Sequence, residues 1–293
     1  MPFEIQFIKL LQKASSTILD FLAELITFFG EQYVVIFVLA FIYFVYNKKL
    51  GEKIAFTLFL SLGLNNSLKG LVKAPRPFTV DPEIIGMRQS TATGFSFPSG
   101  HTQVSAAFYT SIAKHLKNKK FWIFTGILIF LVGISRIYLG VHFPKDVIVA
   151  IILGIAIAFL GSNLYDLYGK TYKSKQIMFA ITALLLLPFV FIFYKSDYNE
   201  ILPFRDFYTN YALFLGFFAA TLVENKYVDF DCNKPLKTKL IRYLIAIVLF
   251  VTIQFGLKLV LPENNIYLDM FRYFLVTFIP MGIYPLFFKK LNL

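Results

Sequence analysis

The sequence has few of the residues that stabilise small secreted domains or cover the surface of soluble ones. Cys232 is the single cysteine in 293 residues, so no disulfide bond can form within the chain. Charged residues make up 16% of the sequence, whereas soluble domains contain about 25%. Residues 1–30 contain neither a basic leader nor a small-residue cleavage site, which predicts that no signal peptide is removed. These absences exclude a disulfide-rich secreted domain and argue against a soluble fold.

Apolar residues take the place of the missing charges. The chain is 57% hydrophobic and 18% aromatic, and its mean hydropathy is +0.66. Its apolar runs reach about 16–20 residues, enough for an α-helix to cross a hydrocarbon core of roughly 30 Å. We therefore expect an all-α integral membrane protein, a polytopic bundle of transmembrane helices. The predicted spans lie near residues 32–47, 53–72, 101–116, 121–139, 147–166, 177–194, 208–223, 241–258 and 272–288.

The net charge of +12 is spread over short clusters between the apolar runs, and no long basic arm is present. This pattern is typical of membrane loops, so no nucleic acid partner is expected. Loops rich in Lys and Arg are interpreted as cytoplasmic, and these are 47–53, 114–120, 167–176, 224–240 and the C-terminal tail. The opposite side is then extracytoplasmic, at a cell membrane, and it holds the N-terminal segment and the loops 73–100, 140–146, 195–207 and 259–271.

Three short stretches concentrate ionisable residues next to predicted spans, where such residues are costly and mark functional sites. They are 69–77 (KGLVKAPRP), 97–101 (FPSGH) and 135–146 (SRIYLGVHFPKD). All three fall on the predicted extracytoplasmic side. Two histidines, two arginines, a lysine and a serine at one depth would form a strongly cationic pocket, and such a pocket suits a tetrahedral oxyanion.

The spacing of these residues also indicates catalytic roles. Asp146 follows His142 by four residues, so on the first turn of the next span its carboxylate can accept the imidazole N–H. That hydrogen bond leaves the other ring nitrogen free as a nucleophile. His101 is then suited to protonate the leaving oxygen. Ser99 is expected to cap the helix that begins at Gly100, whose backbone N–H can approach an anion.

The three stretches resemble the signature motifs of the type 2 phosphatidic acid phosphatase (PAP2) superfamily. The pattern Lys-x6-Arg-Pro, Pro-Ser-Gly-His and Ser-Arg-x5-His-x3-Asp is matched at every defined position and in the same order. The resemblance implies that His142 attacks phosphorus and forms a phosphohistidine, that Asp146 orients it, and that His101 protonates the leaving group. It also implies that neither a metal nor another cofactor is needed. The phosphate-binding residues that it implies are Lys69, Arg76, Ser99, Gly100 and Arg136.

Three parts of the chain are expected from this resemblance and from the spans. An amphipathic interfacial helical segment (1–30) precedes a PAP2-type phosphatase core (31–170). A C-terminal transmembrane extension (171–293) follows and contains the last four predicted spans. The extension is compatible with a lipid entry groove and with a homodimer face.

The substrate implied by the resemblance is a phosphorylated lipid of the surrounding membrane, with undecaprenyl pyrophosphate as the first choice. Phosphatidate, phosphatidylglycerophosphate and sphingoid phosphates are alternatives. A sugar phosphatase similar to glucose-6-phosphatase, a phosphotransferase, and a binding or transport protein for lipid phosphates also stay open. The intact set His101, His142 and Asp146 favours an enzyme, because binding alone needs no nucleophile.

Overall fold

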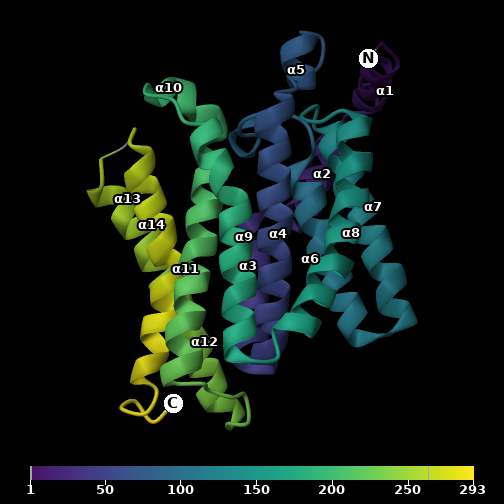
Figure 1. The fold of residues 1–293 in the computed structure, drawn as a ribbon. Helices are drawn as coiled ribbons and strands as arrows, with labels where there is room; N and C mark the ends of the chain where they lie inside the picture. Colours follow the sequence, from purple (N-terminus) through teal and green to yellow (C-terminus); the bar gives the residue numbers. More distant parts are fainter. Residues whose placement is uncertain (1, 263) are drawn as a thin grey trace. The chain divides into compact units, whose positions relative to one another are not determined.

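Helices account for the regular structure of the chain (Figure 1). The computed structural model describes residues 2–262 and 264–293, and no strand occurs among these residues. The all-α prediction is therefore confirmed. In chain order the helices are α1 (Pro2–Lys13), α2 (Thr17–Phe28), α3 (Gln32–Phe41), α4 (Lys48–Val72), α5 (Pro77–Val80), α6 (Gly100–Leu116), α7 (Lys119–Tyr138), α8 (Pro144–Tyr168), α9 (Tyr172–Ile192), α10 (Tyr198–Ile201), α11 (Arg205–Tyr227), α12 (Leu236–Val251), α13 (Leu257–Val260) and α14 (Ile266–Phe278). Short π and 3₁₀ turns extend several of them, at Ile42–Tyr46, Gln89–Thr91, Leu202–Phe204, Thr252–Gly256, Ile279–Ile283 and Tyr284–Phe287.

These helices form two compact units, and each unit combines separate stretches of the chain. The first unit consists of the residues up to Val35 together with Leu60–Ser162. The second consists of Ile36–Phe59 together with Asn163–Leu293. Helix α4 therefore begins in the second unit and ends in the first. All three motif stretches belong to the first unit, and the three-part division expected from the sequence stays a prediction.

Within the described part of the chain, five helices are long and apolar enough to cross a membrane. They are Lys119–Tyr138, Pro144–Tyr168, Tyr172–Ile192, Leu236–Val260 and Ile266–Phe287. A sixth span results if α2 and the segment Gln32–Tyr46 together form one broken span. The predicted spans 53–72, 101–116 and 208–223 are also helical, as parts of α4, α6 and α11, but these helices are not among the five. Helix α6 has 17 residues, short for a span, and all three helices contain buried polar side chains, such as Glu52, Gln103 and Glu224.

The N-terminal helices pack within the first unit. Ile8 of α1 is fully buried in a cluster with Ile137 and Phe143, and Ala23 of α2 packs in a second cluster that includes Tyr138. Lys9 forms an ion pair with Asp81 at 2.8 Å, which joins α1 to the loop after α5. The expected interfacial segment is thus a pair of helices attached to the residues that carry the third motif.

Buried polar side chains join the start of α4 to other helices of the second unit. Glu52 is fully buried, forms an ion pair with Lys175 of α9, and accepts hydrogen bonds from the hydroxyl of Tyr165 and the amide of Asn225. Lys48 forms an ion pair with Glu224 of α11 at 2.6 Å. Because buried charges are costly unless paired, these contacts fix the first turns of α4 against α9 and α11.

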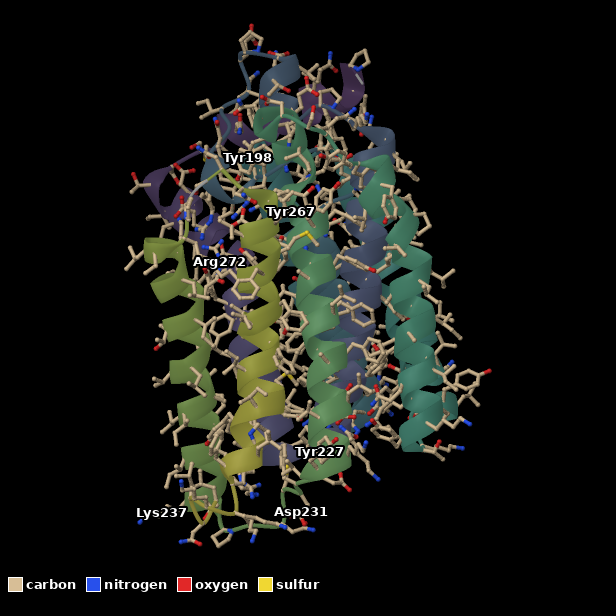
Figure 2. All side chains as sticks on the ribbon, turned by 60° about the vertical axis from the view of Figure 1, so that its left-hand side comes forward. Tyr198, Tyr227, Asp231, Lys237, Tyr267 and Arg272 are labelled. Atoms are coloured by element: carbon tan, nitrogen blue, oxygen red, sulfur yellow. The ribbon has the colours of Figure 1, made fainter. Side chains whose placement is uncertain are left out.

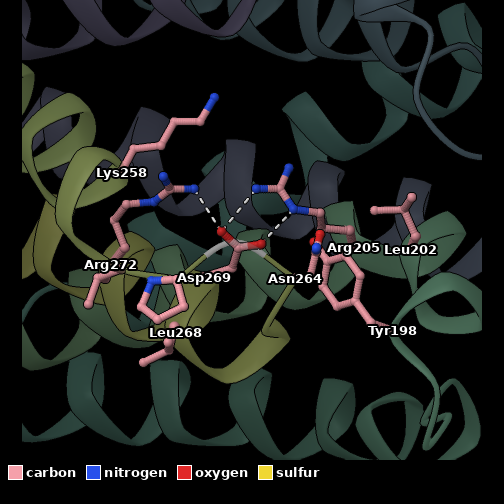
Figure 3. Close-up of a pocket in the computed structure, with 10 residues that line it drawn as sticks. Tyr198, Leu202, Arg205, Lys258, Asn264, Leu268, Asp269 and Arg272 are labelled. Atoms are coloured by element: carbon pink, nitrogen blue, oxygen red, sulfur yellow. Dashed lines mark hydrogen bonds and ion pairs between the residues drawn. The ribbon is translucent and has the colours of Figure 1, made fainter.

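Helices α11 and α14 lie side by side in the second unit. Gly216 permits the close approach, because a Cβ there would overlap the Thr277 hydroxyl and the Phe274 carbonyl of α14. Figure 2 shows Tyr198, Tyr267 and Arg272 toward one end of this unit and Tyr227, Asp231 and Lys237 toward the other. At the first of these ends Asp269 joins two arginines of α11 and α14 (Figure 3).

Candidate active site

The first motif lies where α4 ends. Lys69 is in the last turn of α4, and Arg76 lies in the loop before α5. Pro75 and Pro77 flank Arg76, and proline cannot continue a helix because it lacks the N–H donor. Arg76 takes an extended backbone conformation, with φ −87° and ψ 155°. The local sequence therefore ends the helix and presents the guanidinium from an extended segment.

The second motif forms the beginning of α6. Ser99 occupies the N-cap position, and Gly100 and His101 are the first residues of the helix. The expected capping by the Ser99 side chain is wrong, because its hydroxyl makes no cap hydrogen bond and lies 2.9 Å from the hydroxyl of Thr102. The backbone N–H of Ser99 instead donates to the carbonyl of Asp146 at 3.1 Å. This bond connects the second motif to the third.

The third motif forms the turn between α7 and α8. Gly140 has φ +69°, a left-handed conformation that glycine adopts readily, and a Cβ there would overlap the Ile85 carbonyl. His142 follows in this turn, outside both helices. Asp146 lies in the first turn of α8, as predicted. The turn brings the imidazole and the carboxylate to the same end of the helix.

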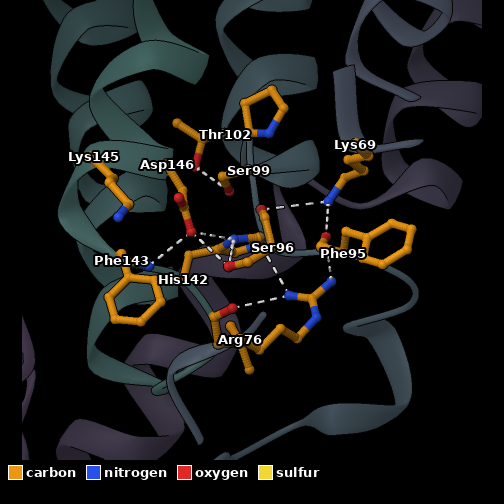
Figure 4. Close-up of polar contacts among 12 residues, drawn as sticks. Lys69, Arg76, Phe95, Ser96, Ser99, Thr102, His142, Phe143, Lys145 and Asp146 are labelled. Carbon is orange, nitrogen blue, oxygen red and sulfur yellow. Dashed lines mark hydrogen bonds and ion pairs between the residues drawn. The ribbon is translucent and has the colours of Figure 1, made fainter. Parts of the chain in front are cut away.

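His142 is 1% exposed and lies next to Asp146 and Ser96 (Figure 4). Its Nδ1 is 3.4 Å from Oγ of Ser96 and 3.5 Å from Oδ2 of Asp146. The Ser96 hydroxyl donates to the same Oδ2 at 2.6 Å, and the Phe143 backbone N–H donates to it at 3.0 Å. Asp146 therefore reaches the imidazole both directly and through the hydroxyl of Ser96.

Arg76 and Lys69 hold the loop that precedes the second motif. Arg76 Nη1 lies 3.4 Å from Nε2 of His142 and donates to the Val141 carbonyl at 2.9 Å. Its other nitrogens donate to backbone carbonyls of residues 93–95. The Lys69 ammonium donates to a carbonyl of the same loop. These two cations thus position the loop and bring positive charge to the nitrogen of His142 that faces away from Asp146.

Several polar atoms of the motif residues are buried and make no hydrogen bond within the described part of the chain. These atoms are Nε and Nη2 of Arg136, Nε2 of His101 and Oδ1 of Asp146. Arg136 is fully buried, and its Nη1 donates to Oγ1 of Thr27 at 3.1 Å. An unpaired buried polar group costs about 1–3 kcal/mol, so such groups require an explanation. A bound anion would provide acceptors for the donors of Arg136.

The charge around His142 affects its protonation. Burial, together with the positive charges of Arg76 and Lys69, holds the pKa of His142 well below its usual value of 6.5. The imidazole is therefore neutral at neutral pH, and one ring nitrogen keeps a lone pair. With Nδ1–H directed at Ser96 and Asp146, that lone pair is on Nε2, beside Arg76.

The structure brings the predicted site residues together to different degrees. Recorded contacts join Lys69 and Arg76 to the loop of Ser96, and His142 to Asp146. His101 and Arg136 lie within electrostatic reach of His142. Ser99 and Gly100 lie at the start of α6, and the backbone N–H of Ser99 joins this motif to the third one through its hydrogen bond to the Asp146 carbonyl.

Ser96 and Thr27 were missed by the sequence reasoning. Ser96 lies three residues before Ser99, and a polar residue between two phenylalanines beside a motif was the available signal. Thr27 gave no signal, because 109 residues separate it from Arg136. No three His, Cys, Asp or Glu side chains gather as metal ligands among residues 2–262 and 264–293.

Two sequence profiles of known families match the chain. The PAP2 superfamily matches residues 51–170, which contain all three motif stretches. The PAP2 superfamily phosphatase transmembrane extension matches residues 208–293. The second match covers most of the C-terminal part of the second unit.

Individual relatives are similar over parts of their length. Phosphatidylglycerophosphatase B of Bacillus subtilis is 48% identical over 92 residues, which are 28% of this chain and 45% of that protein. Undecaprenyl-diphosphatase of Sulfolobus acidocaldarius is 29% identical over 178 residues, 60% of this chain and 84% of that protein. The crystal structure of a transmembrane PAP2 type phosphatidylglycerolphosphate phosphatase from Bacillus subtilis is 26% identical, with a TM-score of 0.49, and covers 56% of this chain and 85% of that one.

Proposed function

We propose that the chain, as a member of the PAP2 superfamily with its transmembrane extension, is an integral membrane phosphatase that acts on a phosphorylated lipid. The reaction is hydrolysis of a phosphomonoester or pyrophosphate bond without a metal ion. Arg136 and His101 carry this proposal, because their buried nitrogens make no hydrogen bond to any residue that the structure describes and both side chains lie within electrostatic reach of His142. Phosphoryl oxygens would accept hydrogen bonds from Arg136, and the leaving oxygen would interact with His101.

His142 is proposed to be the nucleophile. The lone pair on Nε2 attacks phosphorus, and the bond from phosphorus to the leaving oxygen breaks. His101, kept protonated by the negative charge of the bound substrate, gives the leaving oxygen a proton, and Arg136 stabilises the charge on the remaining phosphoryl oxygens. Water then attacks the phosphohistidine and gives its proton to His101, which releases phosphate and restores both imidazoles.

Asp146 is proposed to orient His142. Its Oδ2 lies on the Nδ1 side of the ring, directly at 3.5 Å and through Ser96 at 2.6 Å. An acceptor on that side keeps the proton on Nδ1 and stabilises the positive charge that the ring acquires when Nε2 bonds to phosphorus. Asp146→Asn is therefore expected to reduce turnover severely, but less than His142→Ala.

The remaining motif residues are proposed to bind the phosphoryl group. Arg76 already lies 3.4 Å from Nε2 of His142, where the phosphorus would be bonded. Lys69 contributes positive charge beside the same loop, and Ser99 and Gly100 lie at the N-terminus of α6, where the helix dipole favours an anion. The interactions of these donors and charges with the phosphoryl oxygens would become stronger as negative charge develops in the transition state.

A lipid substrate is favoured because the family match and the apolar helices locate the site in a membrane protein. One relative is named undecaprenyl-diphosphatase and another phosphatidylglycerophosphatase, so undecaprenyl pyrophosphate and phosphatidylglycerophosphate are the first substrates to test. The loop charge bias supports an extracytoplasmic site at the cell membrane.

Phosphate release from a substrate panel tests the proposal. The purified full-length chain would be given undecaprenyl pyrophosphate, phosphatidylglycerophosphate, phosphatidate, sphingosine phosphate and glucose 6-phosphate, each with EDTA present. We expect release from a lipid, none from the His142→Ala variant, and a rapidly quenched ³²P-protein adduct in the wild type that the variant lacks. Preference for glucose 6-phosphate would indicate a sugar phosphatase, and no His142-dependent release from any compound would refute the hydrolase.

A further inference from the structure

The second unit contains a cationic cavity that shares no residue with the proposed active site. The cavity has a volume of about 260 Å³ and lies between the loops that join α9 to α11 and α13 to α14. Its lining residues are Tyr198, Leu202, Arg205, Lys258, Leu261, Pro262, Asn264, Leu268, Asp269 and Arg272. None of the motif residues takes part, so the family motifs do not account for it.

The charges of the cavity are unbalanced among the described lining residues. Arg205, Lys258 and Arg272 come from α11, α13 and α14, and Asp269 is the only acidic residue in the described lining. Asp269 binds Arg205 through Nε at 2.6 Å and Nη2 at 3.0 Å, and Arg272 through Nη2 at 2.8 Å. Among the described lining residues three cations thus face one carboxylate, and a bound anion would interact favourably with them.

Arg272 has unused hydrogen-bonding capacity at this site. The residue is 4% exposed, and its Nε makes no hydrogen bond to any residue that the structure describes. Its remaining recorded contact is with the neighbouring ring of Tyr273, 5.2 Å from the guanidinium carbon. Figure 3 shows the guanidinium groups of Arg272 and Arg205 directed toward each other across Asp269, with Lys258 beside Arg272. A buried arginine with an unpaired donor is costly unless an acceptor occupies the cavity.

The geometry and size of the cavity indicate which anion it accepts. Cations from three separate helices approach the same space, an arrangement that suits the several oxygens of a tetrahedral phosphoryl group better than the two of a planar carboxylate. Pockets for drug-sized ligands measure roughly 300–1,000 Å³, so a cavity of about 260 Å³ suits a headgroup rather than a whole lipid.

The surroundings of the cavity indicate a lipid. Leu259 and Val260 follow Lys258 directly and are 89% and 79% exposed, and Phe271 is 52% exposed beside Arg272. Tyr267, 63% exposed, adds an amphipathic ring of the kind enriched at membrane interfaces. These loops lie on the side that the charge bias predicts to be extracytoplasmic. The excess of Lys and Arg that is usual in cytoplasmic loops therefore does not explain the three cations.

We propose that the cavity formed by Arg205, Lys258 and Arg272 is a second anion site, which binds the phosphoryl group of an anionic membrane lipid. Arg272 and Arg205 bind the phosphoryl oxygens, and Asp269 keeps the two guanidinium groups in place. Lys258 closes the exposed side of the cavity. The acyl chains lie along Leu259, Val260 and Phe271.

Native mass spectrometry of the purified full-length chain tests this site. Dioctanoyl phosphatidylglycerol is the lipid probe, because it is a phosphodiester without a terminal phosphate to hydrolyse. Inorganic phosphate forms a second arm, and dioctanoylglycerol is the phosphate-free control. Saturable binding of the phospholipid, without binding of dioctanoylglycerol, is expected for the wild type, and binding of inorganic phosphate alone would identify a free anion as the ligand and overturn the lipid assignment.

Matched variants locate the binding. Arg272→Gln should weaken phosphatidylglycerol binding about tenfold. Lys258→Gln, at an exposed position, should weaken it roughly threefold. Arg242→Gln is the control for Arg272, since Arg242 is equally buried in the same unit but packs on Phe230 and Phe288. Lys237→Gln is the control for Lys258. Both controls should bind as the wild type does.

The outcomes separate this site from the proposed active site. Equal binding by the wild type, Arg272→Gln and Lys258→Gln would overturn the second site, even if phosphatase activity is present. Selective loss in these variants would support it, even if no substrate of the panel is hydrolysed. If Arg272→Gln fails to fold, Lys258→Gln decides the matter, because Lys258 is exposed.

Discussion

Ser96 connects a carboxylate and an imidazole that are otherwise 3.5 Å apart. Its hydroxyl donates to Oδ2 of Asp146 and leaves its oxygen facing Nδ1 of His142. The loop that carries Ser96 is held by Lys69 and Arg76 through its carbonyl groups. Changes at either cation would therefore alter the orientation of His142 as well as the charge of the site.

Ser96→Ala tests this connection. We expect kcat to fall about tenfold or more with little change in KM, because a hydrogen bond to a charged group contributes roughly 1.5–3 kcal/mol. Ser96→Thr should recover part of the activity, since it restores the hydroxyl. Ser90→Ala, at an exposed position earlier in the same loop, is the control. A wild-type kcat in Ser96→Ala would contradict the role of Ser96.

The dependence of kcat/KM on pH tests the protonation of His142. The proposed mechanism requires a neutral His142 imidazole, and the pKa of His142 is held well below 6.5 by burial and nearby cations. His142 therefore stays neutral when the pH is lowered through 6.5. We expect kcat/KM to fall only at lower pH, where His142 becomes protonated. Rates measured between about pH 4 and pH 8 would give the acidic limb. An acidic limb centred at or above 6.5 that moves with substitution of Asp146 would contradict this prediction.

The motif residues could be predicted from the sequence because short spacings fix them locally. Four residues separate His142 from Asp146, and the start of a helix keeps them together. The partners of Arg136 and of Asp146 could not be predicted, because Thr27 and Ser96 reach them from distant segments. The prediction that the Ser99 side chain caps α6 was wrong, because the Ser99 hydroxyl pairs with the hydroxyl of Thr102, one turn later, and not with a backbone N–H of the helix.

At the scale of helices, the close contact of α11 with α14 depends on Gly216. The Thr277 hydroxyl lies against this position and donates to the Leu213 carbonyl of α11 at 2.9 Å. The space that a side chain at position 216 would need is filled by the backbone of Phe274, which cannot move without shifting α14. The loops that line the cationic cavity are attached to these same two helices.

Gly216→Ala is expected to destabilise the protein by about 1–3 kcal/mol, as overpacked substitutions do. Gly256→Ala is the matched control, because a Cβ at Gly256 has nothing within 4 Å and its φ of −63° suits any residue. The midpoint of thermal unfolding in detergent should fall for the first variant and be unchanged or higher for the second. Equal midpoints for both variants would argue against close packing at Gly216.

The sequence predicted the positions of the helices well. It predicted less well which of these helices are long and apolar enough to cross a membrane. Each predicted span falls within an observed helix or its flanking turns, since long apolar runs are the strongest helical signal here. Helices α4, α6 and α11 are less apolar, because they bury residues such as Glu52, Gln103 and Glu224. The amide of Gln103 pairs with Asn65, which explains a polar residue within α4.

At the scale of the whole molecule, each compact unit is built from two separate stretches of the chain. The PAP2 match begins at residue 51, within the part of α4 that belongs to the second unit. There Lys48 and Glu52 depend on Glu224, Lys175 and Asn225 for their partners. The phosphatase motifs and the extension are thus connected through one continuous helix.

A chain that ends at residue 170 tests this dependence. It retains all three motifs and Tyr165, but it lacks the charged partners of Lys48 and Glu52, which are Glu224 and Lys175. Each unpaired buried charge costs about 3–5 kcal/mol, against a total stability of roughly 5–15 kcal/mol. We expect no monodisperse peak in size-exclusion chromatography and no phosphate release, and partial recovery when residues 171–293 are co-expressed. A truncated chain that is monodisperse and active would show that the extension is dispensable.

The same arrangement determines when folding can finish during synthesis. Ribosomes deliver Lys48 and Glu52 to the membrane more than a hundred residues before Lys175, Glu224 and Asn225. Through that interval the first turns of α4 must keep their charges at the lipid surface or beside temporary partners in the insertion machinery. The three motifs therefore emerge early, but α4 reaches its final depth only after α9 and α11 have been inserted.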